Sequence, residues 1–126
     1  MKRAKTWQEA FKNQGIDPNI MPDTSMLPEE FRKPQEALYK MHIVAKDLNG
    51  EWKPDYTNDS QWKYFPYFEV KANKKTPSGV GLSYLGCADW NSDSIVGVRL
   101  CFKDRDTAEY AGKQFVKLYE DLFLHR

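Results

Sequence analysis

Apolar and polar residues follow a helical spacing towards both ends of the chain and an alternating pattern in its middle. The clearest helical pattern lies near the C-terminus, where apolar residues recur every three or four positions from Ala108 to Leu122. Asp104 precedes this stripe and belongs to a residue type that caps helices. The pattern predicts one C-terminal helix over residues 104–124.

The N-terminal 50 residues are predicted to be helical as well. The run Thr6-Trp7-Gln8-Glu9 has the form of a capping box, so a short helix is expected to begin there and to end at Gly15. A second helix is expected from about Pro28 to Asn49-Gly50. Pro34 disfavours helical geometry in the residue before it. This region therefore forms either one turn followed by a helix over residues 34–48, or a single kinked helix.

Residues 61–102 carry the alternation that is typical of strands. Three segments qualify: 61–71 (QWKYFPYFEVK), 79–87 and 94–102. In the first, the even positions from Trp62 to Val70 share one face and the odd positions from Lys63 to Lys71 share the other. The even face is the better core face. Pro66 cannot donate a hydrogen bond to a neighbouring strand, so we expect an edge strand or one bulged at the proline.

These elements predict an α+β fold. We expect a three-stranded antiparallel meander packed against helices, in the order α-α-β-β-β-α. The 126 residues suit a single domain. Within it we expect a helical part over residues 1–50, a sheet over residues 61–102 and a C-terminal helix over residues 104–124.

Composition and charge favour a soluble, folded protein of the cytoplasm. Hydrophobic residues make up 40% of the chain, which is enough to form a core. The 19 basic and 18 acidic residues argue against a surface that attracts duplex DNA as a whole, and they leave room for a local basic patch. The N-terminus has no apolar signal-peptide region and no apolar run reaches 18 residues, so neither secretion nor membrane insertion is expected.

Motifs for catalysis, metal binding or cofactor binding are missing from the sequence. Asp89-Trp90-Asn91-Ser92-Asp93 matches the start of a calcium loop, but the required glycine and glutamate do not follow. Cys87 and Cys101 lie on different expected strands without metal-ligand spacing, which leaves reduced core thiols or a cross-strand disulfide. His42 lies beside an apolar helical stripe, where a structural role is the simpler interpretation. We therefore expect no catalytic residue, no metal and no cofactor.

A binding surface is the remaining candidate for a functional site. If helices cover the even face of the first strand, the opposite side presents aromatic and basic side chains, with Leu85 as a further apolar member. The candidate binding residues are Lys63, Phe65, Tyr67, Lys71, Lys74, Lys75 and Arg99. Rings that stack on bases, next to cations that contact phosphates, bind single-stranded nucleic acid. The same surface suits a protein partner, whereas a second layer formed by the N-terminal segment would make it core.

Four segments of the chain resemble one protein family. They are TWQEAFKNQGIDP (6–18), LPEEFRK (27–33), QWKYFPYFEV (61–70) and VGVRLCFKDRDTAEYAGKQFVKLYEDL (96–122). Over nearly its whole length the chain is similar to small uncharacterised proteins encoded by bacteriophages and mobile elements of gut Bacteroidales. In that family a Ser usually follows the Val-Gly before Arg99, whereas this chain has Val98. The resemblance implies a phage-type origin and a cytoplasmic setting, and it implies no activity and no site residue.

The sequence as a whole favours a small intracellular binding protein without catalytic activity. The first expectation is a protein partner from the host or the phage. The alternatives are single-stranded nucleic acid bound by the aromatic and basic sheet face, or an enzyme of unrecognised type. No membrane partner is expected, and no oligomeric state is indicated.

Overall fold

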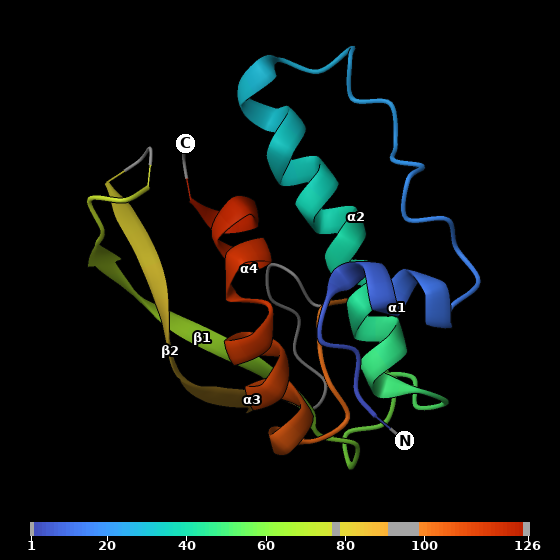
Figure 1. Cartoon of the computed structure of the whole chain (residues 1–126). Coiled ribbons are helices and arrows are strands. Elements are labelled where there is room, and N and C mark those ends of the chain that lie inside the picture. The colour runs from blue at the N-terminus through green and yellow to red at the C-terminus, as the bar shows by residue number, and fades with distance from the viewer. Residues whose placement is uncertain (1, 77–78, 91–98, 125–126) are drawn as a thin grey trace.

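In the part of the chain that the structure describes, a two-stranded antiparallel hairpin packs against four helices. The computed structural model describes residues 2–76, 79–90 and 99–124. Its elements, in chain order, are α1 (Trp7–Asn13), α2 (Glu29–Asn49), β1 (Lys63–Ala72), β2 (Val80–Trp90), α3 (Arg105–Gln114) and α4 (Val116–Phe123). The fold is therefore α+β, with the hairpin on one side of the helices (Figure 1).

The prediction of a three-stranded meander is wrong. Among the described residues the sheet has two strands, β1 and β2. Of the expected third strand, residues 94–98 lie outside the described residues, and Phe102 in the remainder forms an isolated bridge with Tyr64. Leu100 and Phe102 are both buried. In the described part, these two apolar residues therefore mark positions that are buried in the core, and they do not belong to a regular ladder.

β1 and β2 pair along their whole length with one irregularity. The register shifts after Tyr67, where β2 contains the extra residue Leu85. An extra residue of this kind is a bulge, which bends the strand and increases its twist. Pro66 lies on an edge strand, as one of the two predicted alternatives requires, because the sheet of the described residues has two strands. The bulge is at Leu85 on β2 and not at the proline, which pairs regularly with Cys87.

The even face of β1 turns towards the helices, as predicted. Tyr64 and Phe68 pack against the core, and the ring centroid of Phe68 lies 4.9 Å from that of Tyr119 in α4. The two ends of this face depart from the prediction of core residues, because Trp62 is 48% and Val70 is 57% exposed. The helices thus cover the middle of the hairpin and leave its ends more open.

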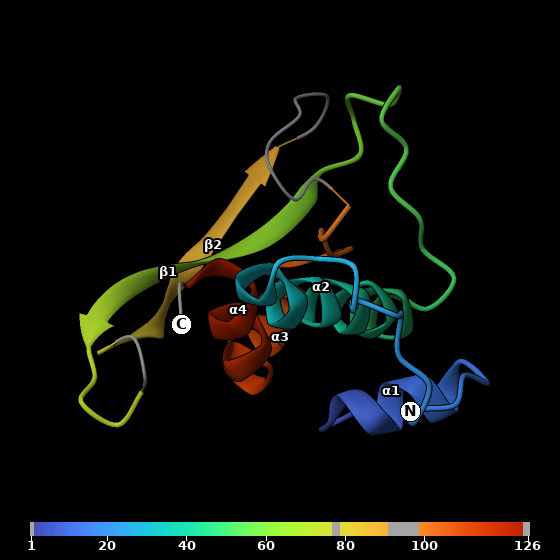
Figure 2. The same ribbon diagram turned by 90° about the horizontal axis from the view of Figure 1, so that it is seen from above.

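The helices are layered behind the hairpin. α3 packs on both strands, α4 packs on β2 and α2, and α1 packs on α2. Seen from above, the hairpin runs along one side of α4 and α3, and α1 lies on the far side of α2 (Figure 2). Buried residues between these layers form the core. The largest of its fully buried apolar side chains are Phe11, Phe102, Met41 and Val44.

The two N-terminal helices form where the sequence predicts them. The Thr6 hydroxyl accepts a hydrogen bond from the Glu9 N–H at 3.1 Å and caps α1. α2 is one continuous helix with Pro34 inside it, so the alternative of a separate first turn is wrong. It ends at Asn49, and the next residue, Gly50, caps it with a φ of 61° that is unfavourable for residues with a side chain. None of the helices in the described ranges is long and apolar enough to cross a membrane.

The single helix predicted over residues 104–124 is divided in two. Phe115 separates α3 from α4, with φ −112° and ψ 26°. Its N–H still bonds to Ala111 O, and its carbonyl accepts from Leu118 and Tyr119, so the chain turns without losing these hydrogen bonds. The turn directs α3 against both strands and α4 against α2. Apolar spacing continues across such a turn, and the periodicity therefore does not reveal it.

Asn49 joins the end of α2 to the segment that leads into α3. Its Nδ2 donates to Cys101 O at 2.9 Å, and its Oδ1 accepts from the Lys103 N–H at 3.0 Å. The side chain is buried, so each of these hydrogen bonds satisfies groups that are shielded from water. On the other side of the same segment, Tyr64 N–H donates to Phe102 O at 3.1 Å and Phe102 N–H donates to Tyr64 O at 2.8 Å.

The contact between α3 and the hairpin can be tested with Gly112→Ala. A Cβ at Gly112 would lie 2.7 Å from Tyr84 Cδ1 and 2.8 Å from Pro66 Cβ. In an exposed helix this change stabilises by about 1 kcal/mol. Because overpacking costs more, we expect the free energy of unfolding in urea to fall by about 1–2 kcal/mol. The exposed replacement Lys117→Ala in α4 should change it by less than about 0.5 kcal/mol. A more stable Gly112→Ala protein would contradict the close packing.

Candidate functional site

The seven candidate binding residues do not form one continuous surface. Lys63 is fully buried, Phe65 is half-buried and Tyr67 is 43% exposed. The other four are exposed cations: Lys71, Lys74, Lys75 and Arg99. The predicted combination of rings and cations is therefore divided between buried and exposed positions.

Lys63 is not the exposed cation that strand alternation predicts. Its Nζ donates to Asp55 O at 2.7 Å and to Asn58 O at 3.2 Å. The same ammonium lies 5.9 Å from the ring centroid of Tyr56 and 5.8 Å from that of Trp90. Carbonyl oxygens and ring faces thus replace the water that a buried charge loses. We call these five residues the lysine cage, and it fastens residues 51–62 to the start of the hairpin.

Cys101 lies next to the lysine cage and is buried. Burial raises the pKa of the Cys101 thiol to about 11, although a backbone hydrogen bond, Lys63 and Tyr56 act in the opposite direction. Burial also raises the pKa of the Tyr56 hydroxyl above its ordinary value. The thiol and the hydroxyl therefore keep their protons at neutral pH, and this corner offers no ready nucleophile.

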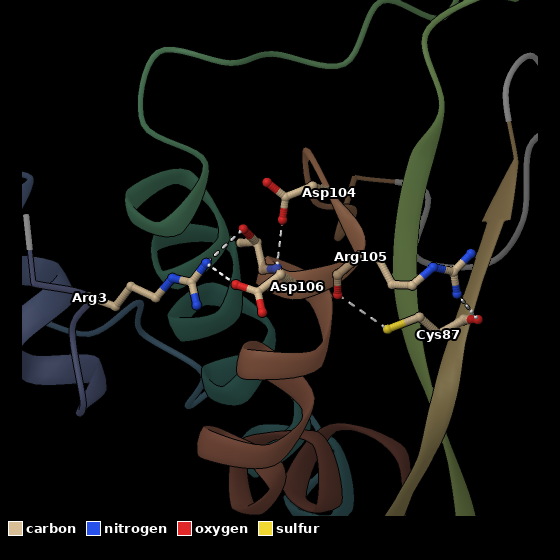
Figure 3. Close-up of polar contacts among 6 residues, drawn as sticks. Arg3, Cys87, Asp104, Arg105 and Asp106 are labelled. Atoms are coloured by element: carbon tan, nitrogen blue, oxygen red, sulfur yellow. Dashed lines mark hydrogen bonds and ion pairs between the residues drawn. The ribbon is translucent and has the colours of Figure 1, made fainter.

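A second polar cluster joins β2 to the first residue of α3 (Figure 3). Arg105 Nη1 donates to Cys87 O at 3.2 Å, and Arg105 Nη2 donates to Asp89 Oδ2 at 3.1 Å. Cys87 Sγ donates to Arg105 O at 3.5 Å and lies 2.9 Å from the Tyr84 hydroxyl. The Arg105 guanidinium also lies 5.4 Å from the ring centroid of Tyr64. These contacts hold α3 against both strands.

Arg3 fastens the N-terminal segment to the same end of α3. Its Nη2 donates to Asp106 Oδ2 at 2.8 Å and to Thr107 Oγ1 at 3.3 Å (Figure 3). Asp104 Oδ1 accepts from the Thr107 N–H at 2.7 Å and caps the helix. Burial raises the pKa of Asp104, but the hydrogen bonds from Thr107 outweigh it and leave that pKa below its ordinary value. Because these groups are occupied with one another, the cluster is a structural joint.

Neither polar cluster has the arrangement of a catalytic centre. Burial, followed by the hydrogen bond with Cys87, raises the pKa of Tyr84 above its ordinary value, so this tyrosine does not act as a base towards the thiol. Burial and then the charge of Arg99 lower the pKa of His42 on α2. Both cysteines are free thiols, so the alternative of a disulfide is wrong. Among the described residues, no group of three or more His, Cys, Asp or Glu could hold a metal ion.

A hollow of about 840 Å³ lies between the start of α2 and the end of α4. Lys33 and Asp121 meet across it, with Nζ and Oδ1 3.7 Å apart. Charged side chains and two prolines make up most of its lining, and no His or Cys contributes to it. Small-molecule sites are mainly apolar with a few directed polar groups. This hollow does not fit that description.

The outer side of the hairpin carries the candidate surface that remains. The Tyr67 ring lies across Gly86, its partner on β2, since a Cβ at Gly86 would be 2.9 Å from the Tyr67 hydroxyl oxygen. Leu85, the extra residue of the bulge beside Gly86, is 57% exposed. Phe65 is half-buried two positions before Tyr67. We call Phe65, Tyr67 and Leu85 the hairpin face.

The exposed cations lie at opposite ends of the hairpin. The three lysines of residues 71–75 belong to the end of β1 and the turn that follows it. Arg99 lies near the other end, where its charge acts on Tyr56, a ring that stacks on Trp90 of β2. The hairpin face is thus flanked by cations rather than lined by them.

Two features of this region differ from what the sequence predicts or are not predicted by it. Alternation groups Lys63 with exposed positions, and the signal that could have indicated its burial is the pair of aromatic residues Tyr56 and Trp90, which offer ring faces to a cation. The position of Gly86 beneath Tyr67 depends on the register in which β1 and β2 pair. A bulge shifts this register by one residue immediately after the pair Tyr67 and Gly86. Sequence alone does not reveal that register.

Comparisons with known proteins assign the chain to no family. No family model, no curated protein and no solved structure matches it. The resemblance to phage-encoded proteins of gut Bacteroidales therefore stays a prediction from the sequence.

The lysine cage can be tested with Lys63→Met. Methionine keeps much of the buried aliphatic stem but leaves Asp55 O and Asn58 O without the ammonium that now bonds to them. We expect the free energy of unfolding in urea to fall by about 1–3 kcal/mol, as is usual when buried polar groups lose a charged partner. Lys53→Met, at an exposed position of the same loop, is the matched control. Equal effects of the two changes would show that the cage does not stabilise the fold.

The buried thiol predicts a pH dependence that Cys101→Ala should alter. The thiol's pKa is about 11 in the folded protein against an ordinary 9.0. The unfolded chain loses this proton first, so the stability that the protonated thiol contributes is complete below pH 9 and is lost between pH 9 and pH 11. We expect the free energy of unfolding to fall less steeply over this range in Cys101→Ala than in the unmodified protein. Parallel curves would contradict the assignment.

Proposed function

We propose that this protein is a small, non-enzymatic binding protein that contacts another protein through the hairpin face. The observation that carries the proposal is the exposure of Tyr67 and Leu85, 43% and 57%, on a strand pair whose other side is covered by α3 and α4. Exposed apolar side chains that gather on a regular element, with polar residues around them, are typical of protein interaction sites.

The hairpin face suits a protein partner because its central ring is held in place. Tyr67 rests on Gly86, so it loses little conformational freedom when a partner covers it. Leu85 supplies apolar contact area beside the ring. Glu69 and Lys71 lie further along β1 and are exposed, which provides polar groups at the margin.

Single-stranded nucleic acid is the less favoured partner. Bases that stack on rings need cations along the same groove to contact their phosphates. Lys63 is occupied in the lysine cage, and Arg99 lies at the opposite end of the hairpin from the lysines of residues 71–75. The candidate cations therefore do not follow the rings of the hairpin face in one line.

We further propose a cytoplasmic setting in a bacterial host, with a phage or mobile element as the source of the gene. The support is the resemblance of four segments to proteins of that origin. A host or phage protein is accordingly the expected partner. It would present an apolar patch to Tyr67 and Leu85 and polar groups to the exposed residues beside them.

The proposal can be tested by placing a photo-crosslinking amino acid at Tyr67 in the full chain, expressed in a gut Bacteroidales host. We expect crosslinks to one protein, mapped by mass spectrometry to the hairpin face. In affinity capture of that protein, Tyr67→Ala and Leu85→Ser should each reduce recovery by about tenfold or more. Phe31→Ser on α2 replaces a side chain of similar exposure, 48%, and should leave recovery unchanged.

Oligonucleotides distinguish the two kinds of partner. We expect tryptophan fluorescence of the purified protein to stay constant when short single-stranded DNA or RNA is added at low salt. A saturable change that Tyr67→Ala abolishes would overturn the proposal in favour of nucleic acid. Equal capture by the Tyr67, Leu85 and Phe31 variants, all of them folded, would remove the hairpin face from the proposal.

A further inference from the structure

The outer edge of β1 can be identified from hydrogen bonds at two separate places on the hairpin. Tyr64 directs its N–H and its carbonyl away from β2, towards Phe102. On β2, Leu82 lies opposite Val70 and directs its N–H away from β1, to Glu120 Oε2 at 2.8 Å. Because backbone groups of alternate residues point to alternate sides of a strand, Phe68, Val70 and Ala72 also direct their backbone groups away from β2.

This edge is exposed beyond the part that the helices cover. Glu69, Val70, Lys71 and Ala72 are all exposed, and Val70 keeps 57% of its surface in contact with solvent. Within the described ranges, no hydrogen bond is found between the outward backbone groups of residues 68–72 and any other residue. In Figure 1 the end of β1 lies at the outside of the molecule, with β2 between it and α4.

The edge of β2 is protected where that of β1 is open. The Glu120 carboxylate from α4 accepts the Leu82 N–H, and Thr76 Oγ1 donates to Val80 O at 2.6 Å. An exposed and unprotected strand edge is a template for pairing with another strand. Of the two edges, that of β1 is therefore the one open to a partner strand.

The charges along this edge are complementary to those of a second copy that runs in the opposite direction. If two β1 strands pair antiparallel with Val70 opposite Val70, Glu69 of each copy lies opposite Lys71 of the other. Both residues are exposed, and the contact found for them within the described ranges is one of 3.8 Å with each other. Opposite charges directly across strands are stabilising and like charges are destabilising.

Neighbouring registers are worse. A pairing centred on Glu69 or on Lys71 would place two like charges directly opposite each other. A pairing centred on Phe68 would need the backbone of Tyr64, which Phe102 already occupies, and would bring in Pro66, which has no N–H. Only the register centred on Val70 uses outward backbone groups throughout residues 68–72 and also pairs the charges.

We propose that two copies of this chain associate through residues 68–72 of β1, antiparallel and centred on Val70, to form one four-stranded sheet. The contact is isologous and closes as a two-fold dimer. About six backbone hydrogen bonds join the copies, from the mutually facing pairs of Phe68, Val70 and Ala72. The interface lies beside the hairpin face and does not use Tyr67 or Leu85, so it is independent of the proposed function.

Sedimentation velocity of the full chain from about 1 µM to about 500 µM tests the dimer, a range chosen because small interfaces are weak. We expect a concentration-dependent dimer. Val70→Pro removes the central N–H at a position where an edge strand tolerates proline, and it should leave the chain monomeric. Glu69→Lys and Lys71→Glu should each raise the dissociation constant by about tenfold. The double variant Glu69→Lys/Lys71→Glu restores both pairs and should recover the dimer.

A cysteine at the centre tests the register directly. In an antiparallel hydrogen-bonded pair the Cα atoms are about 5.5 Å apart, which a disulfide spans. We expect Val70→Cys to form a covalent dimer under mild oxidation. Ala72→Cys, at an equally exposed position, should not, because its counterpart lies about 13 Å further along the strand.

Three results would overturn the proposal. One is a chain that stays monomeric over the whole range. Another is a dimer that Val70→Pro and the single charge variants leave intact while circular dichroism shows them folded. The third is a chain that stays monomeric and loses capture of the partner protein in the variant Val70→Pro, but keeps it in Tyr67→Ala. The edge of β1 would then bind a strand of a different protein. Loss of capture in Tyr67→Ala alone bears on the hairpin face and not on the dimer.

Discussion

The carboxamide of Asn49 supports the point where the parts of the fold meet. It accepts from the Lys103 N–H and donates to Cys101 O, so the end of α2 serves residues 101–103 as a neighbouring strand would. Phe102, between them, bonds to Tyr64 on the other side. One buried stretch thus links α2, the hairpin and the start of α3, with backbone groups paired on both sides. Two residues later α3 begins, already behind the hairpin.

This arrangement determines which parts of the hairpin are covered. Near Tyr64 the start of β1 is held by Phe102 and by the lysine cage, and around Pro66 it is covered by α3. The last inward ring on β1 is Phe68, which meets Tyr119 of α4. Beyond it Val70 belongs to the same inward row but finds no helix to cover it. The helices and Phe102 hold the start of β1, so the candidate binding surfaces lie on the outer side of the hairpin and towards the end of β1.

Local signals in the sequence predicted much of this, and contacts between distant residues account for the rest. The Thr6 cap, the stop at Gly50 and the inward even face of β1 follow from residue types and spacing. The buried Lys63 does not, since its environment is assembled from Asp55, Asn58 and two rings that only the fold brings together. The expected third strand failed for a similar reason. Leu100 and Phe102 are buried although Phe102 forms an isolated bridge with Tyr64, so alternating apolar residues indicate buried positions and do not by themselves indicate a ladder.

The charges at the outer edge of β1 distinguish selective pairing from aggregation. An exposed edge attracts any apolar strand, and charged residues oppose this because burying them against such a strand leaves them unpaired. Two charges of one sign would oppose every partner, including a second copy. Glu69 and Lys71 have opposite signs on one face, two residues apart. Pairing with an unrelated strand therefore costs the free energy of desolvating both charges. An inverted copy in one register offsets this cost, because each charge then faces an opposite charge. The same two residues thus protect the edge and select its partner.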